Sequence, residues 1–339
     1  MSQHLLKVFL EHQGDNPDQL FMALDCWGQA VYKALQSYEI DYKYVFAKDI
    51  NPIFMEGGNN WSLLLPDEDL NQRAVYEVKT VDFKHCDPDI VIENIINQNQ
   101  LVVVHTAFDL IPAYDKKEIT VLDRTHYSII VGYNDHYFYV MDNPFVFNKA
   151  ENIVHPNFPN ISMIAKTGMK EAFKKKCELK TIQIKPEALS GVNNLDNLLK
   201  RIVATFYSAK TEKNEEHVLF YGKQALVKLI KALDNSDSEC DKNSFLNNHY
   251  NAHLLYSSRL ILKWCLEDDR QYHYSPHYGD VCYNLDSSMG KWQIAKMVIA
   301  KNNMKSSSNF LRNLKENILA ILETEEKLIE SLSKLVDCK

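Results

Sequence analysis

Glycine and proline are scarce in this sequence, with 10 of each among 339 residues. Their scarcity excludes a collagen-like chain and argues against long disordered or low-complexity segments. Hydrophobic residues make up 45% of the chain and charged residues 24%, which is the balance of a globular protein that can bury a sizeable core. Because domains usually contain about 100–200 residues, we expect two of them.

The chain has no excess of basic residues, and its net charge is -7. A general nucleic-acid binder needs a basic field to displace counterions, so we expect no nucleic-acid partner. Long apolar runs are also missing, since HYSIIVGY has only the length of a strand and a membrane span needs roughly 18 residues. The first residues show no signal-peptide pattern. We therefore expect a cytoplasmic protein with no membrane partner.

Seven cysteines are present, but no two of them form a CxxC pair. A disulfide framework and a structural zinc site are therefore not expected. His85 and Cys86 are adjacent but lack a second ligand pair, and Pro276 breaks the helix that would align His273 with His277. We predict no metal site, and each cysteine is by default a buried free thiol.

The two halves of the chain have different patterns, with a boundary near residue 191. The first half mixes strand and helix signals, whereas from about residue 194 apolar residues recur almost throughout at helical spacing. The sequence predicts an α+β domain at 1–190 and an all-α helical domain at 191–339. The elements expected in the first domain are helices at 26–38 and 87–100, strands at 42–47, 101–107 and 180–184, a loop at 51–66, and a hairpin at 125–144 that turns at Asn134–Asp135.

Three residues far apart in the sequence have the chemistry of a nucleophilic site. Cys26 stands at the expected start of a helix, where unpaired amide groups and the helix dipole favour a thiolate. His126 begins the first strand of the expected hairpin and Asp142 ends the second, so both lie at its open end. Asp142 can orient the imidazole, whose other nitrogen can accept the thiol proton. The pattern predicts a Cys26–His126–Asp142 triad for acyl transfer.

The order of these residues, with Gly132 six residues after His126, resembles the bacteriocin-processing branch of the papain-like cysteine proteases. Over most of its length the chain also resembles the butirosin biosynthesis protein H family. The matching segments, in chain order, are DCWGQAVYKAL, QLVVVHTAFDL, RTHYSIIVGYNDHYFYVMDNP, YGKQALVKLIKAL, SSRLILKWCLEDD and GKWQIAKMVIAK. This resemblance implies a papain-like cysteine-protease-type domain followed by a helical C-terminal domain.

The resemblance also implies a function, which is acyl transfer in specialised-metabolite or antibiotic biosynthesis of the nonribosomal-peptide type. In this interpretation Cys26 attacks a thioester on an acyl-carrier or peptidyl-carrier protein and passes the acyl or aminoacyl group to a small amine. The donor is the phosphopantetheine arm of the carrier, and no other cofactor is implied. A homodimer is left open.

Four further residues are weaker candidates. Papain-like enzymes have a Gln about six residues before the cysteine to complete the oxyanion hole. Position 20 here is Leu, so Gln19 is the candidate donor. Asn143 is the alternative orienter of His126, and Trp27 and Trp61 are candidates for the walls of a substrate pocket.

Several alternatives remain open at this stage. The family often has His before the cysteine, whereas Asp25 here opposes thiolate formation unless it caps the helix. The same triad would suit a peptidase or thioesterase-like hydrolase, and a domain without activity would be a binding scaffold. His105 is expected to be a core histidine. The basic segment 166–180 is interpreted as a solvated face, with docking of an acidic carrier protein as the alternative.

Overall fold

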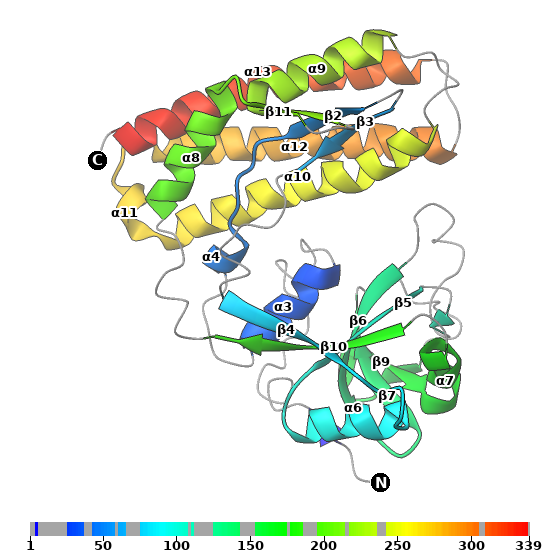
Figure 1. Ribbon diagram of the computed structural model, residues 1–339. Coiled ribbons are helices and arrows are strands. Elements are labelled where there is room, and N and C mark those ends of the chain that lie inside the picture. Colours follow the sequence, from blue (N-terminus) through cyan, green and yellow to red (C-terminus); the bar gives the residue numbers. More distant parts are fainter. Residues whose placement is uncertain are drawn as a thin grey trace. The chain divides into compact units, whose positions relative to one another are not determined.

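The computed structural model shows a mixed α+β protein in which antiparallel sheets are followed by a helical C-terminal region (Figure 1). The chain forms two compact units. Unit 1 combines residues 1–42 and 73–190, and unit 2 combines residues 43–72 and 191–339. The structure describes residues 4–5, 26–36, 43–57, 60–65, 75–107, 110–111, 125–142, 153–174, 177–185, 195–213, 217–235, 242–304 and 309–337.

Unit 1 is built on an antiparallel sheet with the strand order β4-β10-β5-β6-β7-β9-β8, and β1 pairs with β6. Within the described residues, three helices belong to the same unit. The strands are β1 (His4–Leu5), β4 (Tyr76–Val81), β5 (Val102–Ala107), β6 (Thr125–Tyr133), β7 (Tyr137–Met141), β8 (Ile153–His155), β9 (Phe158–Ala165) and β10 (Cys177–Ile184). The helices are α3 (Cys26–Gln36), α6 (Pro88–Asn97) and α7 (Lys166–Lys174).

Local sequence explains the best-formed elements of unit 1. Strand β5 is a run of β-branched residues whose first three members are fully buried at the middle of the sheet. Helix α6 starts as expected, because the Asp87 carboxylate accepts from the Asp89 N–H and Pro88 occupies the first helical position. The hairpin of β6 and β7 turns where expected, and the Asn134 side chain accepts from the amides of His136 and Tyr137.

Unit 2 combines long helices with a small antiparallel sheet of order β11-β12-β2-β3. Its core joins Phe54 and Leu63 from this sheet to Leu226, Trp292 and Leu314 from the helices. The strands are β2 (Ile53–Gly57), β3 (Asn60–Leu64), β11 (Thr211–Lys213) and β12 (Val218–Tyr221). The helices are α4 (Lys43–Phe46), α8 (Leu195–Tyr207), α9 (Gly222–Asn235), α10 (Lys242–Asp268), α11 (Arg270–His273), α12 (Tyr278–Met304) and α13 (Phe310–Asp337).

A polar cluster is buried among the helices of unit 2. The Glu325 Oε1 atom accepts hydrogen bonds from Arg259 Nε at 2.9 Å, Ser288 Oγ at 2.6 Å and Trp292 Nε1 at 2.8 Å. Arg259 and Trp292 are fully buried and Glu325 is 1% exposed. Such a cluster is stable only while the charges stay paired, because an unpaired ion in an apolar interior is costly.

Three sequence-based expectations about the residues of unit 2 are wrong, and the first is that residues 191–339 are all-α, since strands β11 and β12 lie there. The segment expected to be a strand contains helix α4, and the segment expected to be a loop contains the paired strands β2 and β3. Strand β2 pairs with β12, which lies more than 150 residues later in the chain. That pairing puts residues 43–72 in unit 2, so a continuous domain at 1–190 is not what the structure shows.

Within the described residues, no helix is both long enough and apolar enough to cross a membrane. The cysteines described by the structure, at positions 26, 86, 177, 265 and 282, all carry free thiols. The same part of the chain contains no group of three or more His, Cys, Asp or Glu side chains that could hold a metal ion.

Candidate active site

His126 and Asp142 meet across the hairpin of β6 and β7. Ile130 pairs with Val140, so side-chain alternation along the two strands puts His126 and Asp142 on the same face of the sheet. The His126 Nε2 atom lies 2.7 Å from Asp142 Oδ2. The hairpin therefore joins two residues that stand sixteen positions apart.

This pair is shielded from solvent, and the shielding changes its electrostatics. The side chain of His126 is 14% exposed and that of Asp142 is 1% exposed. Burial alone would lower the pKa of His126, but the Asp142 charge, its hydrogen bond and the neighbouring Cys26 thiol together raise that pKa to about 10. The imidazole therefore carries a proton at neutral pH.

Cys26 is the first residue of helix α3 and is partly exposed. Helix α3 forms because Ala30, Val31, Ala34 and Leu35 recur at helical spacing, and all four are buried in unit 1. The Cys26 side chain hydrogen-bonds to His126. Because Nε2 of the ring faces Asp142, Nδ1 is the ring nitrogen left for the thiol. The structure thus brings the three predicted site residues together.

Aromatic side chains form a wall next to Cys26, starting with Trp27 on helix α3. Trp27 was a candidate from the sequence, and the other members of the wall were not. The Trp27 ring lies 5.0 Å from that of Tyr127, and its Nε1 donates to the Tyr76 hydroxyl at 3.1 Å. Tyr127 in turn stacks on His105 at 4.3 Å. His105 is not a core histidine as expected, because its side chain is 22% exposed and its Nδ1 lies 3.4 Å from Glu178.

One signal in the sequence was sufficient to find part of this wall. Tyr127 directly follows His126 in β6, so its side chain points to the opposite face of the sheet. Helix α3 packs on β6 and β10, which brings Trp27 against that face. The partners Tyr76 and His105 come from β4 and β5, and only the strand order reveals that these strands lie nearby.

The structure gives no position in this group to the other sequence-based candidates. Gln19, Asn143 and Asp25 lie outside the described residues. Trp61 belongs to β3 of unit 2, whereas Cys26 belongs to unit 1. The basic segment 166–180 is not one solvated face, because Lys166 is buried, pairs with Glu93 and lies 4.9 Å from the centre of the Tyr133 ring.

Comparison with known proteins does not assign this chain to a family. No protein-family model matches the chain, and no curated protein matches it significantly. The chemistry of the site therefore has to be argued from its own residues. A cysteine, a histidine and a buried carboxylate that lie next to one another are the arrangement of nucleophile, base and orienting group that acyl transfer uses.

Proposed function

We propose that this protein is a cysteine-dependent acyltransferase whose nucleophile is Cys26. The observation that carries the proposal is the position of His126, which is hydrogen-bonded to Asp142 on one side and to Cys26 on the other. Reactive cysteines occur beside positively charged groups, and a protonated imidazole is such a group. Because Cys26 is partly exposed, a substrate or a reagent can reach this residue.

The reaction divides into two acyl transfers. In the first, the Cys26 sulfur forms a bond to the carbonyl carbon of a thioester, and the leaving thiol takes the proton of His126 as its own C–S bond breaks. In the second, an amine attacks the Cys26 acyl-enzyme while His126 accepts the amine proton. A C–N bond forms, the Cys26 thiolate leaves and the original protonation state returns. Asp142 holds the ring and stabilises its charge in both steps.

The finer assignment rests on the family resemblance of the sequence. We propose that unit 1 is a papain-like domain, that the thioester is carried on the phosphopantetheine arm of an acyl-carrier or peptidyl-carrier protein, and that a small amine accepts the acyl group. The antiparallel sheet of unit 1 and the position of Cys26 at the start of a helix are compatible with such a domain. The class of pathway would be specialised-metabolite biosynthesis in the cytoplasm.

A small thioester tests the nucleophile. Incubation with an acyl N-acetylcysteamine thioester, a stand-in for the phosphopantetheine end, should add one acyl group that intact-mass spectrometry detects and peptide mapping assigns to Cys26. Cys26→Ala should abolish the adduct. Cys86→Ala is the matched control, because Cys86 is exposed in the same unit and should leave labelling unchanged. Wild-type labelling in Cys26→Ala would contradict the proposal.

The fate of the acyl-enzyme separates transfer from hydrolysis. Addition of a small primary amine should discharge the adduct and give an amide product that mass spectrometry identifies. Release of the free acid alone, at a rate that the amine leaves unchanged, would instead assign a thioesterase-like hydrolase with the same residues. A Cys26 that reacts no faster with iodoacetamide than the exposed Cys86 would favour a binding scaffold without activity.

A further inference from the structure

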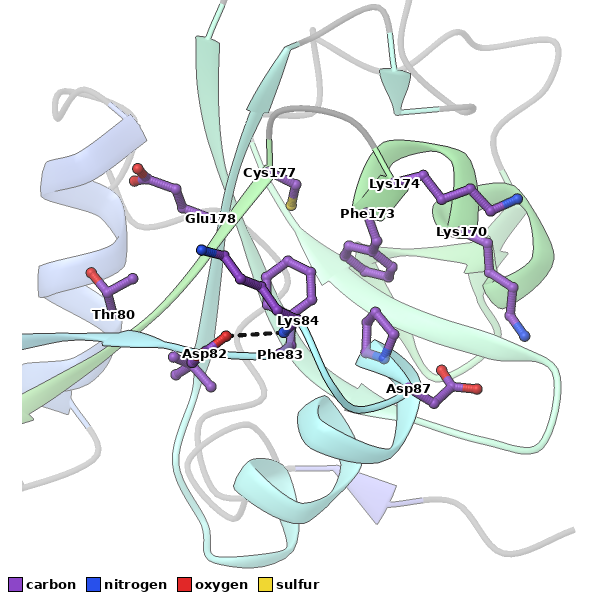
Figure 2. A pocket seen from close by; sticks show the side chains of 12 residues that line it. Thr80, Asp82, Phe83, Lys84, Asp87, Lys170, Phe173, Lys174, Cys177 and Glu178 are labelled. Carbon is purple, nitrogen blue, oxygen red and sulfur yellow. Dashed lines mark hydrogen bonds between the residues drawn. The ribbon is translucent and has the colours of Figure 1, made fainter.

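Unit 1 contains a cavity that the triad does not use. Its volume is about 820 Å³, which lies in the range of small-molecule sites. The wall comes from the end of β4 and the turn after it, the start of α6, helix α7 and the start of β10 (Figure 2). Four elements of one compact unit therefore surround a single space.

The middle of this cavity is apolar. The rings of Phe83 and Phe173 lie 6.4 Å apart in an edge-to-face arrangement and both face the cavity (Figure 2). Pro88 and Cys177 complete the apolar surface. Burial raises the pKa of the Cys177 thiol to about 12, so this sulfur is neutral at physiological pH and offers a ligand an apolar contact.

The acidic residues of the rim are already engaged as acceptors. Asp82 accepts from the backbone N–H of Lys84 at 3.0 Å, and Asp87 accepts from that of Asp89 at 3.0 Å as the cap of α6. Glu178 pairs with a lysine outside the cavity at 3.0 Å and lies 3.4 Å from a histidine nitrogen. Each of these carboxylates therefore already holds a group of the protein itself.

The basic residues of the rim are exposed to solvent. Lys84 and Lys174 are exposed, and Lys170 is 48% exposed with Asp89 at 3.6 Å. Figure 2 shows Lys170 and Lys174 extending from α7 on the side of the cavity opposite Glu178. An ammonium group has three donors, so a single ion pair leaves it able to bind an anion.

From this arrangement we propose that the cavity binds a small amphipathic anion, a molecule with an aromatic or branched apolar body and a carboxylate or phosphate group. The apolar body lies against Phe83 and Phe173, and the anionic group lies toward Lys170 and Lys174. A carboxylate and a phosphate would be bound by the same chemistry, since lysine binds either anion as a point charge.

The cavity and the triad are distinct but close. Cys177 pairs with Thr106 on β5, and Thr106 pairs with His126 on β6. Two interstrand spacings, or about 10 Å, therefore separate the backbone at the cavity wall from the backbone of His126. Binding to the cavity needs no reaction at Cys26, so this proposal does not depend on the proposed acyl transfer.

Four probes that share a naphthyl group and differ in their polar group test which class of ligand binds. The probes are 2-naphthoate, 2-naphthyl phosphate, 2-naphthamide and 2-naphthylmethylamine, and calorimetry or ligand-observed NMR measures their affinities for the full chain. We expect the better of the two anions to bind at least about fivefold more tightly than the amine, as one exposed charge interaction provides. The comparison between the carboxylate and the phosphate identifies the preferred anion. Equal affinity of all four probes, or no saturable binding at millimolar concentration, would overturn the proposal.

Matched variants place the binding in the cavity. Lys170→Gln/Lys174→Gln should weaken the preferred anion about fivefold and leave the amide unchanged. Lys79→Gln/Lys185→Gln removes the same charge from unit 1 outside the cavity and should leave all affinities unchanged.

A third substitution tests the apolar contact. Phe83 is only partly buried, so Phe83→Ala should retain the fold, which circular dichroism checks, and weaken every probe about tenfold. Repeating the titrations in Cys26→Ala should give wild-type affinities, which keeps this result separate from the outcome for catalysis. An anion affinity that is the same in the Lys170/Lys174 and Lys79/Lys185 variants would refute the site.

Discussion

His126 is the residue in which the electrostatics of the site are concentrated. Its pKa of about 10 results from Asp142 and Cys26 acting against burial, so removal of the Asp142 charge should leave burial dominant. We expect Asp142→Asn to bring the pKa of His126 down toward or below the ordinary value of 6.5. A histidine NMR titration, with the assignment made from His126→Gln, measures both values.

The same shift makes stability depend on pH with a definite sign. The folded-state pKa of His126 is raised above 6.5, so its contribution to the free energy of unfolding is complete below pH 6.5 and is lost as the pH rises to about 10. Urea unfolding of the wild type should therefore show unit 1 weakening across that window. Asp142→Asn should flatten this part of the pH profile, and an unchanged profile would show that the pair does not control it.

The positions of the candidate site residues were predicted better than their surroundings. Cys26, His126 and Asp142 were found because few residue types can act as nucleophile, base and orienting group, and because the hairpin has a simple register. The contact between His105 and Tyr127 was missed, because it depends on which strands are neighbours. Sequence periodicity gives the face of a strand but not the strand beside it.

At the scale of elements, the turn between β6 and β7 sets the register that aligns the triad. Asn134 Oδ1 accepts two backbone N–H groups at 2.9 and 2.8 Å and the residue is nearly buried, whereas Asp135 is exposed in the same turn. Loss of this acceptor leaves two backbone donors unsatisfied, so Asn134→Ala should cost about 1–2 kcal/mol of stability.

The neighbouring position provides the control for this experiment. Asp135→Ala changes a residue of the same turn and should shift the free energy of unfolding by less than about 0.5 kcal/mol, as exposed substitutions usually do. Chemical denaturation compares the two variants. The rate of Cys26 alkylation should also fall in Asn134→Ala, because a shifted register separates His126 from Asp142. Equal stabilities for the two variants would show that the turn does not fix the hairpin.

The strands that were missed have a common physical cause. Strand β2 includes Gly57 and exposes Glu56, a pattern that resembles a loop when it is taken alone. Its stability comes from pairing with β12, which follows helix α8, and from packing Phe54 into the core of unit 2. Contacts at such distance in sequence override local propensity, so composition alone could not place this strand.

At the scale of the whole molecule, each of the two compact units is built from two separate segments of the chain. The change in pattern near residue 191 was predicted from helical periodicity, and the inclusion of residues 43–72 in unit 2 was not. The long helices were predictable because their apolar residues repeat over many turns. Which of them share a buried ion pair depends on packing, and the Arg259–Glu325 pair joins residues 66 positions apart.

That ion pair gives a test of how unit 2 is held together. Glu325→Gln removes the charge that Arg259 needs, and Arg259 is fully buried, so we expect a loss of about 3–5 kcal/mol. Glu330→Gln is the matched control on helix α13, since Glu330 pairs with Lys334 in solvent and its loss should leave the free energy of unfolding nearly unchanged. Hydrogen exchange followed by mass spectrometry resolves the peptides of each unit. Glu325→Gln should raise exchange in helices α10, α12 and α13, because these helices supply the partners of Glu325. Protection of those three helices equal to that in Glu330→Gln would mean that shape complementarity, and not the buried charge pair, holds the bundle.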